Sequence, residues 1–180
     1  MLDRTVPPPS AGAPQHGGIN YALRRVIEAH LAWLGQRAEG VRADFSGATL
    51  SDAQLEGANL SRAIFRGTSM LETVLISADL TGAVIESSDL RQASLSHADL
   101  AGASLTGTNC NLCRLEGANL SESTLQSVSF IGSDLGSARL LEARIRDCDF
   151  RGASFKDAGL HHTQIFDTTF GDANLEGAVF

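Results

Sequence analysis

The residues ADFSGATLSDAQLEGANLSR (43–62) decide the fold of this chain, because they begin a five-residue repeat that continues to Phe180 without a slip of register. An apolar residue stands at the centre of each of the twenty-eight repeats. A small residue stands two positions before every centre, most often alanine and otherwise serine, threonine, cysteine or Val128. The first four centres are Phe45, Leu50, Leu55 and Leu60.

A five-residue period fits neither common secondary structure. On a helix that turns about 100° per residue, each five-residue step rotates the apolar position by roughly 140°, so no apolar stripe survives. In a flat strand, side chains alternate between the two faces, and an odd step places successive centres on opposite faces. A chain that bends at every repeat, with each centre pointing inward, satisfies the pattern, so the sequence predicts a solenoid.

The spacing at which similar residues recur predicts four sides for each coil. At a spacing of twenty, Phe45 aligns with Phe65, and every twentieth residue from Leu60 to Leu160 is leucine. A three-sided coil, with a spacing of fifteen, aligns only Phe155 with Phe170. Twenty-eight sides then make about seven coils, and at about 4.8 Å between neighbouring strands the rod is about 30 Å long.

Five stretches carry a resemblance to a known family. They are A-D-F-S-G (43–47), A-N-L-S-R (58–62), A-D-L-T-G (78–82), A-D-L-A-G (98–102) and A-N-L-S-E (118–122). They closely resemble the A-[DN]-L-x-x pattern of pentapeptide-repeat proteins, over about three quarters of the chain. The resemblance implies an all-β solenoid of the right-handed quadrilateral β-helix type, in agreement with the four sides deduced from the spacing.

The chain divides into three segments. Residues 1–18 hold four prolines and three glycines with little to bury, and we expect them to be disordered. Residues 19–37 show helical periodicity, with Leu23, Val26, Ile27, His30, Leu31 and Leu34 on one face and Asn20 as the N-terminal cap. We expect this amphipathic helix to cap the open end of the β-helix formed by residues 41–180, with docking of its apolar face and Trp33 on a partner or membrane as the alternative.

Composition favours a cytoplasmic protein without a cofactor. Cys110, Cys113 and Cys148 all occupy inward positions of the repeat and are interpreted as small core residues. Cys110 and Cys113 form a C-x-x-C string, but no second pair completes a metal site. Neither a signal peptide nor a membrane-spanning run is expected from the sequence.

Apolar residues beside the centres mark a candidate protein-binding patch. Such positions should face solvent, and in the second and third coils they include Ile64, Leu71, Val74, Ile76 and Val84. Ile64 and Val84 are twenty residues apart and should stack on one outer side. Cover by the N-terminal helix, or ordinary lateral packing, is the alternative to a binding patch.

The C-terminal coil is a candidate dimer contact. The chain stops at Phe180, itself a central residue, with no polar cap after it. We expect Phe170, Leu175, Val179 and Phe180 to stack on a second copy across a two-fold axis, unless the natural protein continues.

The acidity of the chain raises a second candidate function. The formal charge is −7, and residues 41–180 hold eighteen acids against ten bases. Family members that confer quinolone resistance are thought to mimic DNA in the DNA-binding saddle of gyrase, and the resemblance allows that role here. The four sides carry net charges near −1, −3, −3 and −2, so no side is strongly acidic. The best mimic surface consists of Asp157, Asp167, Asp172 and Glu176.

Catalysis and direct nucleic-acid binding are disfavoured by the sequence. Serine and aspartate follow the repeat rather than converging on one place, a filled inner column leaves no room for substrate, and no basic stripe is present. His97, His161 and His162 are interpreted as solvated corner residues rather than metal ligands. We therefore expect a non-catalytic rod or scaffold that binds an unidentified protein. The alternative is a DNA-mimicking regulator of gyrase or another type II topoisomerase.

Overall fold

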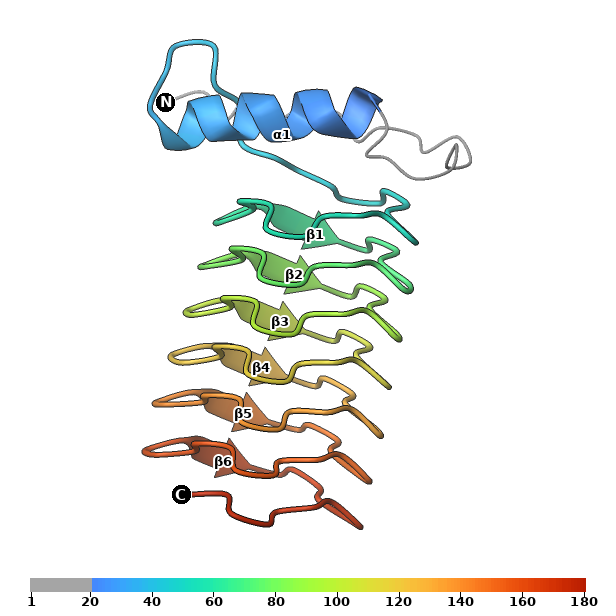
Figure 1. Ribbon diagram of the computed structural model, residues 1–180, viewed down its shortest axis with the longest axis vertical. Coiled ribbons are helices and arrows are strands. Elements are labelled where there is room, and N and C mark those ends of the chain that lie inside the picture. Colours follow the sequence, from blue (N-terminus) through green and yellow to red (C-terminus); the bar gives the residue numbers. More distant parts are fainter. Residues whose placement is uncertain (1–20) are drawn as a thin grey trace.

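The computed structural model describes residues 21–180 and shows a parallel β-solenoid covered at one end by a helix (Figure 1). The helix α1 spans Tyr21–Leu34. Six three-residue strands follow, and they are β1 (Ile64–Arg66), β2 (Val84–Glu86), β3 (Ser104–Thr106), β4 (Thr124–Gln126), β5 (Arg144–Arg146) and β6 (Gln164–Phe166). The segment 1–18, for which we expected disorder, and the proposed cap Asn20 lie outside the described residues.

The stacking of the coils confirms the spacing of twenty. Strands β1 to β6 form one sheet in chain order, every pair is parallel, and Ile64 pairs with Val84 in the first register. Asp44 forms an isolated parallel bridge with Ile64, so this side continues one level above β1. Isolated bridges at the same spacing join the other three sides, as between Thr49 and Ser69. The backbone of each coil is therefore bonded to the coils above and below it.

The four sides are named here by the repeats of the first coil. Side A begins at 43–47, side B at 48–52, side C at 53–57 and side D at 58–62, and each continues at intervals of twenty residues. Strands β1 to β6 all lie on side A.

The inner column is filled by the central side chains. Every centre from Phe45 to Leu160 is at most 3% exposed. The aromatic rings predicted to align do stack, with centroids 5.1 Å apart for Phe45 and Phe65 and 4.9 Å apart for Phe130 and Phe150. In the last coil no described residues lie beneath the core, and Leu175 is 39% and Phe180 64% exposed.

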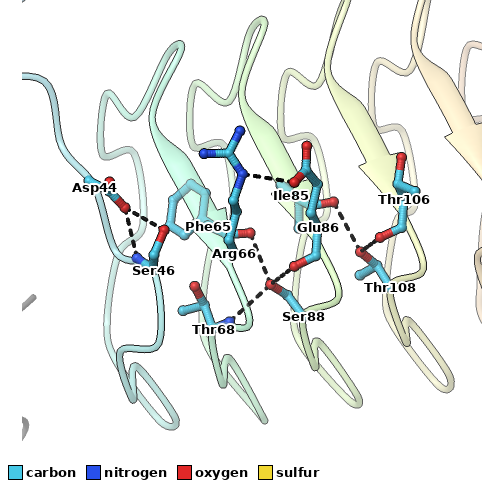
Figure 2. Close-up of polar contacts among 10 residues, drawn as sticks. All are labelled: Asp44, Ser46, Phe65, Arg66, Thr68, Ile85, Glu86, Ser88, Thr106 and Thr108. Atoms are coloured by element: carbon cyan, nitrogen blue, oxygen red, sulfur yellow. Dashed lines mark hydrogen bonds and ion pairs between the residues drawn. The ribbon is translucent and has the colours of Figure 1, made fainter. Parts of the chain in front are cut away.

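Where an Asp or Asn precedes a centre, its side chain closes a turn. Asp44 accepts a hydrogen bond from the backbone N–H of Ser46 at 2.9 Å (Figure 2), and Asn59 accepts one from Ser61 at 3.1 Å. Such side chains stabilise tight turns because they satisfy a backbone donor locally. The chain then bends through a residue of positive φ, as at Gly47 with φ 69°. The Asp or Asn of the repeat therefore serves to stabilise the turn at the corner of the coil.

A second regularity links the coils through the small residue of the repeat. The Ser88 hydroxyl donates to the Phe65 carbonyl at 3.0 Å, and the Thr108 hydroxyl donates to the Ile85 carbonyl at 3.1 Å (Figure 2). In each case the donor lies twenty-three residues after the acceptor. Where this position is serine, threonine or cysteine rather than alanine, the side chain can therefore tie its coil to the centre of the coil above.

Helix α1 caps the first coil through one half of its surface. Leu23 and Val26 join the core cluster of the solenoid, and Ile27 packs against it. The expectation that Leu31 shares this buried face is wrong, because its side chain is 46% exposed. The chain then folds back along the helix, where a Cβ at Gly40 would overlap the backbone nitrogen of Trp33. Only a glycine allows this close approach.

Candidate interaction surfaces on the outer wall

The outer wall presents the two residues that flank each centre. These side chains lie on a regular grid because the strand spacing repeats coil after coil. Three kinds of feature stand out on this grid: apolar residues near α1, charged residues with and without partners, and the apolar residues of the last coil.

The apolar residues near α1 form a band around the solenoid rather than a patch on one side. Ile64 and Val84 are register partners on side A, as their spacing predicted. Leu71 lies on side B, and Val74 and Ile76 lie on side C. Ile64 is 6% exposed, whereas the other four are partly buried. Leu71, Val74, Ile76 and Val84 are therefore more accessible to a partner than Ile64.

The four acids proposed as a mimic surface lie on three sides of the last two coils. Asp157 and Glu176 share side C, where the Asp157 N–H donates to the Glu176 carbonyl at 2.8 Å. Asp167 lies at a corner of side A and Asp172 at a corner of side B. The four acids are separated because each belongs to a different pentapeptide, and successive pentapeptides lie on successive sides of the coil.

Several other charges on the wall are neutralised locally. Arg151 binds both carboxylate oxygens of Asp149, and Thr169 also donates to this carboxylate. These bonds, led by the one from Arg151, lower the pKa of Asp149 to about 2. Arg91 binds Asp89 in the same way, so the pKa of that carboxyl is also lowered.

One arginine lies against an exposed aromatic ring. The Arg146 guanidinium is 5.1 Å from the centroid of the Phe166 ring, on the neighbouring strand of side A. Its nearest carboxylate oxygen is on Asp167, at 3.9 Å, and both side chains are more than half exposed. This geometry is a surface cation–π contact, with a weak, solvent-screened ion pair beside it.

The candidate dimer residues lie at the end of the rod remote from α1 (Figure 1). Val179 is 50% exposed, and Leu175 and Phe180 are exposed as well. Phe170 is partly buried, and its ring stacks on that of Phe150 with centroids 5.3 Å apart. The last coil therefore presents apolar side chains, and its use as a dimer contact stays a prediction.

The three cysteines lie in the core, as their place in the repeat predicted. The hydrogen bond with the neighbouring Cys113 thiol, and after it burial, raises the pKa of the Cys110 thiol. The Cys113 thiol donates to the Leu90 carbonyl at 2.8 Å, which is the same tie between coils that serine and threonine make. Among residues 21–180, no group of three or more histidine, cysteine or carboxylate side chains is arranged to hold a metal ion.

Sequence reasoning missed the bonds made by two inward polar positions. The first is the hydroxyl or thiol tie between coils, whose signal is the choice of serine, threonine or cysteine over alanine. The second is His30, which is fully buried and bonds two backbone groups of the solenoid. Its helical periodicity indicated a buried position, but the two partners are 13 and 31 residues away and carry no local signal.

These features define a class of protein: a four-sided parallel β-solenoid with a solid core, whose recognition surfaces must lie on its walls and ends. The chain belongs to the pentapeptide repeat family. A model of pentapeptide repeats matches four overlapping stretches, 41–75, 53–92, 73–109 and 86–121, and a model of the pentapeptide repeat region matches residues 104–180. The family is generally non-catalytic.

Solved structures that match this chain include proteins of different roles. A trypsin-treated variant form of QnrB1, a plasmid-mediated fluoroquinolone resistance protein, is 17% identical over 76% of this chain and 81% of its own, with a TM-score of 0.50. HetL, involved in heterocyst differentiation regulation in the cyanobacterium Nostoc sp. strain PCC 7120, is 22% identical over 91% of this chain and 97% of its own, with a TM-score of 0.27. At 17% identity the likeness to QnrB1 shows the fold alone.

No protein of curated function matches this chain in sequence. Within the described part of the chain, no helix is long and apolar enough to cross a membrane.

Proposed function

We propose that this protein is a non-catalytic rod that binds another protein through its outer wall. The observation that carries this proposal is the solid core, in which every centre from Phe45 to Leu160 is at most 3% exposed. An interior packed in this way has no room for a substrate. The polar side chains that could support catalysis are spread over the grid, and many of the aspartates close turns.

The apolar band near α1 is the proposed contact surface. Val74, Ile76 and Val84 are large aliphatic side chains on a wall otherwise rich in serine, aspartate and arginine. Apolar groups at partly exposed positions are typical of protein interfaces, whose cores are depleted in charge. The parallel backbone bonds hold these side chains on a fixed grid, so a partner can bind without ordering them.

Charge substitution in the band tests the proposal. The partner is first identified by photo-cross-linking and purification from the cells that make the protein. Val84 lies on side A and Ile76 on side C, so either Val84→Lys or Ile76→Lys, whichever side the partner contacts, should weaken binding of that purified partner by at least about tenfold. The reason is that a lysine at the centre of an interface must lose its hydration. Leu141→Lys is the matched control, since Leu141 is an exposed aliphatic residue on side D, away from the band.

Circular dichroism shows whether each variant keeps the fold. Equal binding by folded Ile76→Lys, folded Val84→Lys and the control would exclude the band as the contact surface. If no protein is captured under any condition, the proposed function itself is wrong.

The runner-up function is regulation of gyrase or another topoisomerase by DNA mimicry. It is supported by the net charge of −7 and by the fold shared with QnrB1. The distribution of Asp157, Asp167, Asp172 and Glu176 over three sides weakens it, because a duplex mimic needs rows of negative charge along a face. A gyrase supercoiling assay with the purified protein tests it, and an unchanged reaction at micromolar protein would exclude this function.

A further inference from the structure

A buried imidazole joins α1 to the solenoid through both of its nitrogens. His30 is 0% exposed and lies on the inner half of α1. Its Nδ1 is 3.1 Å from the backbone nitrogen of Ala43, and its Nε2 is 3.0 Å from the carbonyl oxygen of Ser61. Ala43 opens the first coil and Ser61 lies at its end, so the one ring bonds both ends of that coil.

The two partners determine the protonation state of the ring. The Ala43 N–H can only donate, so Nδ1 must accept and carries no proton. The Ser61 carbonyl can only accept, so Nε2 must carry the proton. The docked arrangement therefore requires a neutral imidazole in a single tautomer.

A proton added at Nδ1 would face the Ala43 N–H, and two donors cannot bond each other. The charged ring would also lie in a site removed from water. Arg42 and Asp79 are the charged groups near the ring, and Arg42 disfavours the added charge whereas Asp79 favours it. Burial is the largest influence, and the pKa of His30 lies below its ordinary value of 6.5.

The rest of the attachment is small. The other buried side chains of α1 are Leu23, Val26 and Ala32. Tyr21, Ala22, Arg24, Arg25, Glu28 and Leu31 are exposed. A helix with few buried contacts belongs to the part of a protein that opens most readily. Loss of the Nδ1 bond to Ala43, together with the cost of a charge buried beside it, therefore removes a large part of what holds α1 in place.

We propose that α1 is an acid-sensitive cap, released from the first coil when His30 takes up a proton at Nδ1. Release uncovers the apolar end of the inner column next to Phe45 and the backbone edge of the first coil. Such an edge can pair with another strand, so proton uptake makes this end of the rod available for association. At neutral pH the ring is uncharged and the end stays covered.

Trp33 reports on the docking of α1 in the intact protein. It is the only tryptophan, and its ring stacks on His30 with centroids 5.6 Å apart. Its fluorescence is followed from about pH 7.5 to about pH 4.5, the range in which histidines titrate. Nitrogen-15 chemical shifts of the His30 ring give the midpoint of its protonation in the same protein.

The proposal expects the two midpoints to coincide below pH 6.5, the ordinary histidine value. It also expects amide exchange at Ala43, relative to its intrinsic rate at each pH, to rise by at least about tenfold as α1 detaches. Far-UV circular dichroism should keep the β signal of the solenoid. The comparison of the Trp33 midpoint with the His30 midpoint uses the natural protein only. It therefore tests the release of α1 even if substitutions at His30 prevent docking.

A matched pair of variants gives a second test. In His30→Gln, the side-chain amide can still donate to Ser61 and accept from Ala43 but cannot titrate, so the Trp33 change should disappear. In His97→Gln, which removes a histidine on side C, the change should remain. A Trp33 signal that does not vary with pH in the natural protein, or the same transition in His30→Gln, would overturn the proposal.

Discussion

The clearest quantitative prediction concerns two serines that occupy the same place in the repeat. Ser123 and Ser133 are 0% and 1% exposed, and each lies two residues before a centre. The Ser133 hydroxyl donates to the Cys110 carbonyl at 2.6 Å and accepts from the Cys113 N–H at 3.2 Å. The Ser123 hydroxyl has no hydrogen-bond partner among the described residues. The same Ser→Ala change should therefore act in opposite directions.

The magnitude follows from these contacts. Ser133→Ala loses a buried hydrogen bond, which lowers the free energy of unfolding by about 0.5–1.5 kcal/mol. Ser123→Ala removes a buried hydroxyl whose lack of a partner costs about 1–3 kcal/mol, so this variant should be as stable as the natural protein or more stable. Alanine fits the site, because Ala103 and Ala143 occupy the equivalent position in the coils above and below. The two variants should differ by about 1.5–4.5 kcal/mol.

Urea denaturation followed by far-UV circular dichroism measures the difference. The slope of the transition must be the same for both variants, since a change in slope would indicate a different unfolded or partly folded state. Thermal melting provides a check, because 1 kcal/mol shifts the midpoint by about 2–4 °C in a chain of this size. Equal destabilisation by the two substitutions would refute the assignment of the hydroxyl tie as the stabilising contact.

Four further outcomes are expected. Phe150 is fully buried between Phe130 and Phe170, so Phe150→Ala should cost about 3–5 kcal/mol in urea denaturation, and a loss below about 1 kcal/mol would contradict the stacked core. Leu112 is 57% exposed at a φ of 60°, a conformation that costs a side chain about 1–2 kcal/mol, so Leu112→Gly should stabilise the protein slightly, and a less stable variant would show that Leu112 packs favourably. The Asp149 carboxyl should titrate near pH 2 in carbon-13 NMR. Because its pKa is lowered on folding, its contribution to stability is present above its ordinary pKa of 3.8 and is lost as the pH falls through about 2, and Arg151→Gln should return the midpoint toward 3.8. Phe180→Asp should shift any self-association of the rod toward monomer in sedimentation velocity, whereas dimers that persist in the variant would exclude the last coil as their contact.

The sequence predicted the solenoid because its signal is periodic and local. One apolar residue in five, with similar shapes at a spacing of twenty, specifies which side chains point inward and which coils align. Phe45 and Phe65 stack as that spacing requires. The acidic residue of the repeat also had a local cause, which the turn bond of Asp44 to Ser46 makes visible.

The candidate surfaces were less accessible to sequence reasoning. Ile64 and Val84 were correctly placed on one side, but Val74 and Ile76 lie on another, because two successive repeats turn through two corners of the coil. Leu31 was also predicted to share the buried face of α1, but it is exposed. A helical stripe specifies a face only broadly, and the solenoid buries Leu23 and Val26 of that face but leaves Leu31 46% exposed.

By itself, the sequence determined the register of the whole solenoid, since a repeat that bends the chain every five residues leaves a single way to bury all the centres. Only the tertiary structure decided which polar side chains bond across coils. His30 meets Ala43 and Ser61, and Ser133 meets Cys110, through contacts between positions 13 to 31 residues apart. Ser123 and Ser133 are identical in the sequence pattern and differ in their partners, because a bond between coils depends on where each hydroxyl lies in space, which a five-residue repeat does not encode.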